Sequence, residues 1–358
     1  MLSKKRVLAF GLVLVVCNAD LPKILSCVAG LPRCIGVPDV ESGKDWGCPI
    51  FNNTEGKETL PAPCVTPQQL KLACAGQGAT NFTGRDGTPV TFSHPVDMDT
   101  VKPEHFAWHL SDGRVVAADC AFPNGAPAAE PNEGQTIAIV GDAGGWSNAT
   151  ITKLEIVGAL MLVLRNGTKM SAQGMTYNGD SLVWDNGVQL LDARLEPFST
   201  SGETLKDPLF PPQLHGRFPN HCQVNFPATT HRIRLLFNGG VTHDGTHSLT
   251  PDNTDFFRIK DARGAALPAA AVLGLADLGT KPAPADASAR LGYKEDGDNY
   301  LDICLDLGNG APQPAAVDVI CDAQHQISLP KGLKRARNGL APHSDPTCKA
   351  HTVAVLAA

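Results

Sequence analysis

Residues 92–113 read Phe92-Ser-His-Pro-Val-Asp-Met-Asp-Thr-Val-Lys-Pro-Glu-His-Phe-Ala-Trp-His-Leu-Ser-Asp-Gly113, and residues 237–264 repeat their spacing. In both copies an apolar residue follows the first Phe by four positions, and an aliphatic-x-Pro-acid unit comes next. A segment of alternating apolar and polar residues then begins at a second Phe and ends seven residues later at a Gly. Because this alternation is typical of half-buried strands, the repeat predicts two copies of one β unit.

The alternation extends beyond the repeated stretch. It recurs at residues 135–140 and 154–157, and the matching segments of the second copy are residues 300–305 and 317–320. The chain also holds 35 Gly and 28 Pro but only 18% charged residues, a composition that favours short strands and turns. We therefore expect an all-β protein with two tandem β-sandwiches.

The chain of 358 residues divides into five segments. Residues 1–19 are expected to be a signal peptide, and residues 20–86 a cysteine-rich N-terminal cap with little apolar periodicity. The first sandwich is expected at residues 87–198, and the second, with a basic C-terminal tail, at residues 231–358. Residues 199–230 are rich in Pro and polar residues, which do not favour regular structure, and therefore form the linker.

The N-terminus carries the pattern of a secretory signal. Three basic residues at 4–6 precede ten apolar residues at 7–16, and Ala19 is a small residue at the cleavage position. Ten apolar residues are too few to cross a bilayer as a helix, and no later segment approaches the required length. We expect a protein without a transmembrane segment that is secreted or held at the extracellular surface.

The cysteines predict a disulfide-stabilised protein. Cleavage after Ala19 leaves an even number of them, whereas cleavage after Ala29 would remove Cys27 and leave an odd number. An even number in an exported chain favours disulfides, and the absence of Cys-x-x-Cys pairs makes structural zinc the poorer explanation. The ten disulfide candidates are Cys27, Cys34, Cys48, Cys64, Cys74, Cys120, Cys222, Cys304, Cys321 and Cys348.

Four Asn-x-Ser/Thr sequons occur, beginning at Asn52, Asn81, Asn148 and Asn166. In a eukaryotic secretory pathway they would make the chain a glycoprotein and place these loops on the surface. A bacterial host would leave the same asparagines unmodified.

The first copy of the repeat resembles bacterial Ig-like domains of the S-layer type. The resemblance lies in the Phe-Ser-x-Pro-Val-Asp start at Phe92, the Thr-Val-x-Pro-x-x-Phe segment at Thr100 and the Ser-Asp-Gly turn at Ser111. It covers residues 88–160 and, more faintly, residues 232–322. The resemblance implies two tandem Ig-like sandwiches, the modules of exported surface proteins and multidomain enzymes, behind the small cap. It supplies no catalytic residues.

An acidic run is the best candidate for a metal site. Asp296, Asp298 and Asn299 lie in a Gly-containing turn, and Asp302 follows in an expected strand that turns its carboxylate toward solvent. Oxygen ligands on a flexible turn suit calcium, although the run lacks the spacing of an EF-hand. Acidic turns of this kind also occur without metal. Calcium is the one cofactor that the sequence indicates.

Two histidine pairs are further candidates for metal binding. His105 and His109 lie four residues apart on an expected strand, so both would point away from the core and could bind zinc or copper. His243 and His247 lie in the matching loop, without the helix and the Glu of a zinc protease motif. Solvent-exposed histidines without metal are the simpler interpretation.

The sequence favours binding over catalysis. It contains no Gly-x-Ser-x-Gly nucleophile motif, and a net charge of -6 with a pI near 6.0 argues against nucleic acid as a partner. We interpret the chain as a non-catalytic protein of the cell surface or extracellular matrix that binds or adheres to an extracellular protein or polysaccharide. One alternative is a secreted enzyme that acts on an extracellular polymer at the domain junction. The other is a calcium- or carbohydrate-binding module.

Overall fold

The computed structural model describes residues 21–27, 31–35, 51–52, 58–59, 74–78, 85–123, 134–143, 149–164, 167–178, 188–197, 222–238, 241–243, 247–278, 293–294, 299–308, 310–322, 327 and 350–357. Among these residues the longest helix is α3 (Cys222–Asn225), with four residues, and the other regular elements are strands and 3-10 turns. The expectation of an all-β protein is confirmed. In this part of the chain no helix has the length and apolarity to cross a membrane.

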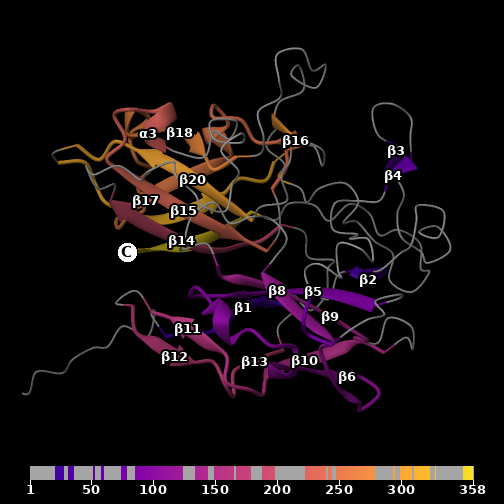
Figure 1. The fold of residues 1–358 in the computed structure, drawn as a ribbon. Coiled ribbons are helices and arrows are strands. Elements are labelled where there is room, and N and C mark those ends of the chain that lie inside the picture. Colours follow the sequence, from indigo (N-terminus) through magenta and orange to yellow (C-terminus); the bar gives the residue numbers. More distant parts are fainter. Residues whose placement is uncertain are drawn as a thin grey trace, which may run out of the picture.

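Two packed sheets form the first unit, coloured indigo to magenta in Figure 1. Its strands are β1 (Ile24–Cys27), β2 (Leu31–Ile35), β5 (Arg85–Phe92), β6 (Phe106–Leu110), β7 (Val115–Ala117), β8 (Cys120–Pro123), β9 (Thr136–Gly141), β10 (Ile151–Ile156), β11 (Met161–Val163), β12 (Lys169–Ser171) and β13 (Thr176–Tyr177). One sheet has the order β1-β5-β9-β8, with β2 also paired to β5, and the other has the order β13-β10-β6-β7. The hairpin β11-β12 flanks them, and β3 (Phe51–Asn52) pairs separately with β4 (Glu58–Thr59).

The second unit, orange to yellow in Figure 1, is built on one seven-stranded sheet. Its strands are β14 (Leu190–Pro197), β15 (His231–Phe237), β16 (His247–Ser248), β17 (Phe257–Asp261), β18 (Val272–Ala276), β19 (Tyr293–Lys294), β20 (Tyr300–Leu305), β21 (Pro314–Val319) and β22 (His351–Ala357). The order is β17-β21-β22-β14-β15-β20-β18, with β14 and β22 parallel, while β16 and β19 form a separate pair. The short helix α3 packs beside β18.

The two units repeat one strand order. The sequence predicted that the strands themselves recur. The order β1-β5-β9-β8 returns as β14-β15-β20-β18, and β13-β10-β6 returns as β22-β21-β17. In each unit a 3-10 turn, η3 (Pro103–His105) or η6 (Thr254–Phe256), leads directly into β6 or β17. Gly113 and Gly264 follow these strands with φ of 88° and 81°, a conformation that glycine adopts without strain.

The alternation of strand residues builds one core in each unit. In the first, Val90 and Ile137 of one sheet pack with Trp108 and Leu154 of the other, and all four are fully buried. The corresponding positions of the second unit carry Leu235, Leu301, Ile259 and Val317, which belong to its core. These apolar positions are what makes the repeat visible in the sequence.

Two expected domain limits were wrong. The segment at 190–197, assigned to a first sandwich of residues 87–198, forms β14, which pairs with β15 and β22 of the second unit. Strands β1 and β2, assigned to the cap of residues 20–86, pair with β5 and so belong to the first unit. Alternation identifies a strand but does not identify its partner, because pairing depends on the tertiary structure.

Two of the expected disulfides join described residues, Cys74 to Cys120 and Cys222 to Cys304, and Cys321 is disulfide-bonded as well. The candidate Cys27 is instead a free, fully buried thiol in the core of the first unit, where burial raises its pKa far above the ordinary value. The side chains of Cys34, Cys48, Cys64 and Cys348 lie outside the described residues, as does the predicted signal peptide. Of the sequons, only the backbone of Asn52, in β3, is described.

Candidate functional site

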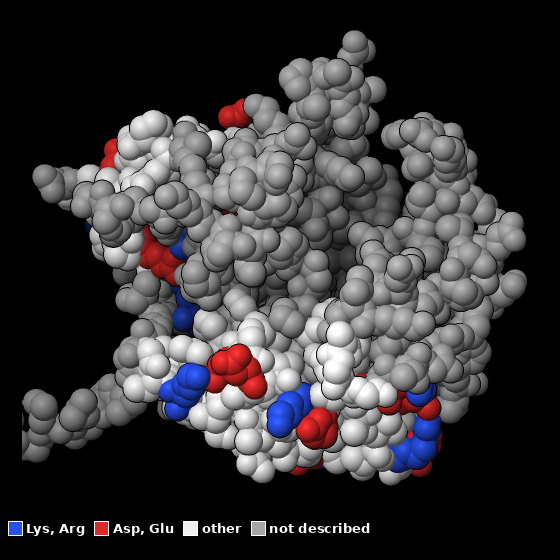
Figure 2. All heavy atoms as spheres, viewed as in Figure 1, with Lys and Arg blue, Asp and Glu red and all other residues white. Residues whose placement is uncertain are grey.

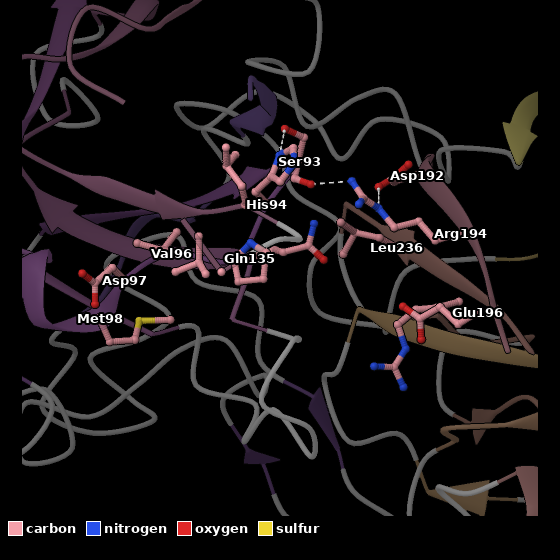
Figure 3. A pocket seen from close by; sticks show the side chains of 15 residues that line it. Ser93, His94, Val96, Asp97, Met98, Gln135, Asp192, Arg194, Glu196 and Leu236 are labelled. Carbon is pink, nitrogen blue, oxygen red and sulfur yellow. Dashed lines mark hydrogen bonds and ion pairs between the residues drawn. The ribbon is translucent and has the colours of Figure 1, made fainter. Parts of the chain in front are cut away.

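A cavity of about 600 Å³ lies where the two units meet (Figure 3). The first unit contributes the segment 93–98, which follows β5, together with residues of the β11-β12 hairpin and Gln135 before β9. The second unit contributes residues of β14 and β15. Both copies of the repeat therefore line this cavity.

The wall from the second unit is charged because of the alternation in β14. Asp192, Arg194 and Glu196 point outward to the cavity, whereas Ala193 and Leu195 between them pack against the core. Both faces of this strand are therefore used, one for folding and one for the cavity.

A buried ion network supports this wall from behind. Asp302 of β20 is fully buried and accepts hydrogen bonds from Arg232 Nη1 at 3.1 Å and from Arg234 Nε and Nη2 at 3.0 Å each. Arg232 Nε also donates to Glu196 Oε2 at 2.8 Å, and Arg234 lies 5.8 Å from the ring centroid of Tyr300. The expectation that Asp302 lies near solvent was wrong, because two guanidinium groups on the neighbouring strand cover its carboxylate.

Arg194 joins the two units directly. Its Nε donates to Asp192 Oδ2 at 2.6 Å, and its Nη2 donates to the carbonyl oxygen of Ser93 at 2.6 Å (Figure 3). The side chain is 15% exposed. A guanidinium held by a carboxylate and a carbonyl in this way is fixed at the cavity wall.

A side-chain amide bonds across the same pair of neighbouring strands in both units. Gln135 Nε2 donates to the carbonyl oxygen of Phe92 at 2.9 Å, and Asn299 Nδ2 donates to the carbonyl oxygen of Phe237 at 3.0 Å. The backbone N–H of each Phe donates in turn to the carbonyl oxygen of Gln135 or Asn299. Asn299 is therefore the counterpart of Gln135, one residue earlier than the alignment of residues 300–305 with 135–140 had placed it.

Each of these two amides also forms a hydrogen bond with a hydroxyl group of the other unit. Tyr300 Oη donates to Gln135 Oε1 at 3.3 Å, and Asn299 Nδ2 donates to Thr136 Oγ1 at 3.1 Å. Since Gln135 corresponds to Asn299 and Thr136 to Tyr300, each contact is the counterpart of the other. The two units therefore dock through the same patch, as subunits of a two-fold symmetric dimer do.

Ser93 and His94 are the side chains at the cavity that most resemble a catalytic pair. Ser93 Oγ lies 3.0 Å from His94 Nδ1 and accepts the backbone N–H of Lys23 at 2.9 Å. In the second unit Asn238 Oδ1 accepts the backbone N–H of Gln189 at the equivalent position. The Ser93 hydroxyl therefore serves to attach the first strand of the unit.

The predicted calcium ligands are brought together only in part. Asn299 and Asp302 lie close in β20 and the residue before it, but both are engaged in the contacts described above, and Asp296 and Asp298 lie outside the described residues. No group of three or more His, Cys, Asp or Glu side chains suited to a metal occurs in the described part of the chain. The calcium site stays a prediction.

The first histidine pair does not form the expected strand face. His105 lies in η3 rather than in a strand, its Nδ1 is 3.0 Å from the carbonyl oxygen of Thr100, and its ring packs against Gly158. His109 in β6 forms a hydrogen bond between its Nε2 and Glu155 Oε2 at 2.8 Å. The Pro103 turn displaces His105 from the strand, and this separates the two rings. His243 is half-buried, and the side chain of His247 lies outside the described residues.

A scan against protein-family models, a search of curated proteins and a search of solved structures each find no match to this chain. Sequence reasoning missed Arg194, Arg234 and His94 as cavity residues. A usable signal was present, because Asp-x-Arg-x-Glu at 192–196 and Arg-x-Arg at 232–234 place charges of both signs on one face of a strand. On the surface shown in Figure 2 the described Lys, Arg, Asp and Glu residues are interspersed, without a large basic patch among them.

Proposed function

We propose that this chain is a secreted, non-catalytic binding protein of the cell surface or extracellular matrix, built on two tandem Ig-like sandwiches with a ligand site between them. The observation that carries the proposal is the cavity at the junction. Its volume of about 600 Å³ suits a small ligand or a short peptide, and both units line it. Clefts between domains are favoured places for ligands.

Two features support an extracellular location. The chain contains disulfides, which form and persist in oxidising compartments. Strand β1 starts at Ile24 and its Cys27 is a core residue, so cleavage after Ala19 retains the strand while cleavage after Ala29 would remove it.

The chemistry of the wall supports binding rather than catalysis. The carboxylates that line the cavity are each paired with a cation, as in Asp97 with Lys169 and Glu196 with Arg232. The described residues that line it include no Trp, Tyr or Phe, the side chains on which sugar rings stack. A ligand other than a polysaccharide therefore fits best.

Uptake of the neutral, polarity-sensitive dye Nile red by the full mature protein tests the proposal. We expect saturable binding at one site per chain. Leu164→Trp, at the cavity wall, should weaken it at least tenfold, and Met170→Trp, on the exposed side of the same hairpin, should leave it unchanged. Absence of saturable uptake, or an equal loss in both variants, would contradict a binding site in this cavity.

The secreted-enzyme alternative has one specific observation in its favour, the Ser93–His94 contact beside the cavity. Hydrolysis of p-nitrophenyl esters of increasing chain length measures it. Under the binding proposal the wild type and Ser93→Ala show the same background rate. A saturable rate that disappears in Ser93→Ala would establish an esterase-like activity instead.

A further inference from the structure

We propose that the ligand of the junction cavity is an amphipathic monocarboxylate, whose carboxylate binds Arg194 and whose apolar body lies against the apolar side chains of the cavity. The inference rests on the proposed function, since it names the ligand class of the same site. Three observations carry it: the position of Arg194, the apolar lining and the balance of charges.

Arg194 is prepared to receive an anion. Asp192 and the carbonyl oxygen of Ser93 hold its Nε and Nη2, at 2.6 Å each. Its hydrogen bonds to other described residues use only these two nitrogens, so Nη1 remains for a ligand. A fixed guanidinium binds a carboxylate without first losing side-chain freedom.

Apolar side chains line much of the cavity. Val96, Met98 and Leu164 come from the first unit, while Leu236 of the second unit, on the strand next to Arg194, lies beside Gln135 (Figure 3). Burying an alkyl body here gains about 25 cal/mol for each Å² of apolar surface removed from water. The cavity therefore offers one polar end and one apolar side to a single molecule.

The charges around the cavity are balanced, so one negative group on the ligand disturbs them less than several negative groups or a positive one. Four carboxylates and four cations face one another in pairs or small networks: Asp97 with Lys169, Asp192 with Arg194, Glu196 with Arg232, and Asp302 with Arg232 and Arg234. An ammonium head would compete with cations that already occupy the carboxylates. A single carboxylate adds to the Arg194 donors without breaking a pair, whereas a polyanion would meet Asp97 and Glu196 as well.

Medium-chain fatty acids and the C-terminus of an apolar peptide share this chemistry. Isothermal titration of the full mature protein with decanoate, decan-1-ol and decylammonium tests the head group. N-acetyl-trileucine, as the free acid and as the amide, tests the peptide source. We expect the acid of at least one source to bind at least tenfold more tightly than its neutral and cationic analogues. Equal affinity for acid and neutral forms in both sources overturns the proposal.

Two variants test whether Arg194 binds the carboxylate of the ligand. Arg194→Gln should weaken binding of the acid at least tenfold and leave binding of its neutral analogue unchanged. Arg263→Gln is the matched control, because Arg263 also pairs with an Asp two residues earlier, Asp261, but is 82% exposed. If Arg194→Gln weakens acid and neutral forms alike, or if Arg263→Gln matches its effect, the assignment of the carboxylate to Arg194 is wrong.

The Nile red measurement separates this inference from the proposed function. Saturable dye uptake without a preference for acids would overturn the ligand class alone. Absence of dye uptake together with absence of binding by every probe would overturn both. Comparing the head groups on the wild type needs no substitution, so a folding defect in Arg194→Gln leaves the test decisive.

Discussion

The two units have the same strand order and equivalent apolar core positions, but the outward faces of their main sheets differ. Where β5 and β9 pair Pro89 with Ala138, the equivalent pair of β15 and β20 is Arg234 with Asp302. Inward positions stay apolar in both because burial fixes their character. Outward positions are free to change, and in the second unit they became the charged support of the junction cavity.

The units also differ in how their sheets close. In the second, β14 pairs in parallel with β22, and this joins all seven strands into one sheet. In the first, the corresponding strands β1 and β13 lie near each other but belong to separate sheets. The second unit therefore has the more continuous sheet of the two, and Arg194 lies on β14, an interior strand paired with β15 and β22.

Removal of a disulfide should have the largest effect on the free energy of unfolding. Both attach a segment that precedes the main strand of a unit, and they close sequence separations of 46 residues in the first and 82 in the second. The entropy of loop closure predicts that the double variant Cys74→Ala, Cys120→Ala loses about 4 kcal/mol of unfolding free energy. The double variant Cys222→Ala, Cys304→Ala should lose about 4.5 kcal/mol. Urea unfolding of both double variants measures the difference. A clearly larger loss for the first pair would show that loop length does not determine how much each disulfide stabilises the protein.

Disruption of the buried ion network around Asp302 should have the next largest effect on stability. Asp302→Ala should destabilise the protein by about 3 kcal/mol or more, because it leaves Arg234 buried without its carboxylate. Adding Arg234→Met, which makes the second unit resemble the uncharged first, should recover part of the loss. Urea midpoints of the two variants test this, and additive losses in the double variant would refute the coupling.

The paired contacts at the junction should have smaller effects. Tyr300→Phe removes the hydrogen bond to Gln135, and Thr136→Val removes the one from Asn299 together with the bond between Thr136 and Thr91. Tyr300→Phe should lower the free energy of unfolding by about 1 kcal/mol, and Thr136→Val should lower it by about 1 to 2 kcal/mol. Thermal unfolding by calorimetry measures both. A loss confined to one variant would show that the junction is not symmetric in energy.

Glu155 and Asp318 occupy equivalent positions in the two units. Their carboxylates should have the smallest effect on stability, and this effect should depend on pH. Hydrogen bonds from Lys153 and then His109 lower the pKa of Glu155. Burial alone would raise the pKa of Asp318, but its bonds with Lys260 and Thr352 outweigh burial and lower it. Because both folded-state pKa values are lowered, the stabilisation is complete above the unfolded-state pKa of about 4 and is lost as the pH falls below it.

Urea midpoints between pH 5 and pH 3 test this dependence. Glu155→Gln and Asp318→Asn should each reduce the fall in stability over this range. The reduction should be larger for Asp318, whose side chain is 13% exposed against 30% for Glu155. An unchanged pH profile in both variants would contradict the role of these pairs.

Much of the fold could be predicted because burial repeats with the period of a strand. Val90, Trp108 and Leu154 marked one core, and the Pro-acid turn before Phe257 marked the start of β17. The site could not be predicted in the same way. Arg194 and Ser93 lie about a hundred residues apart in the sequence. The local sequence pattern around each residue does not indicate that the two are in contact.

The sequence by itself determined the all-β class, the doubled strand pattern and the turns at Gly113 and Gly264, since these follow from local periodicity and backbone conformation. Only the tertiary structure decided that β14 belongs to the second unit, that Cys27 is a core thiol and that Asp302 is buried under two arginines. It also decided that Gln135 bonds to Tyr300, and Asn299 to Thr136, across the junction. The physical reason is that pairing, burial and charge compensation depend on which distant residues become neighbours.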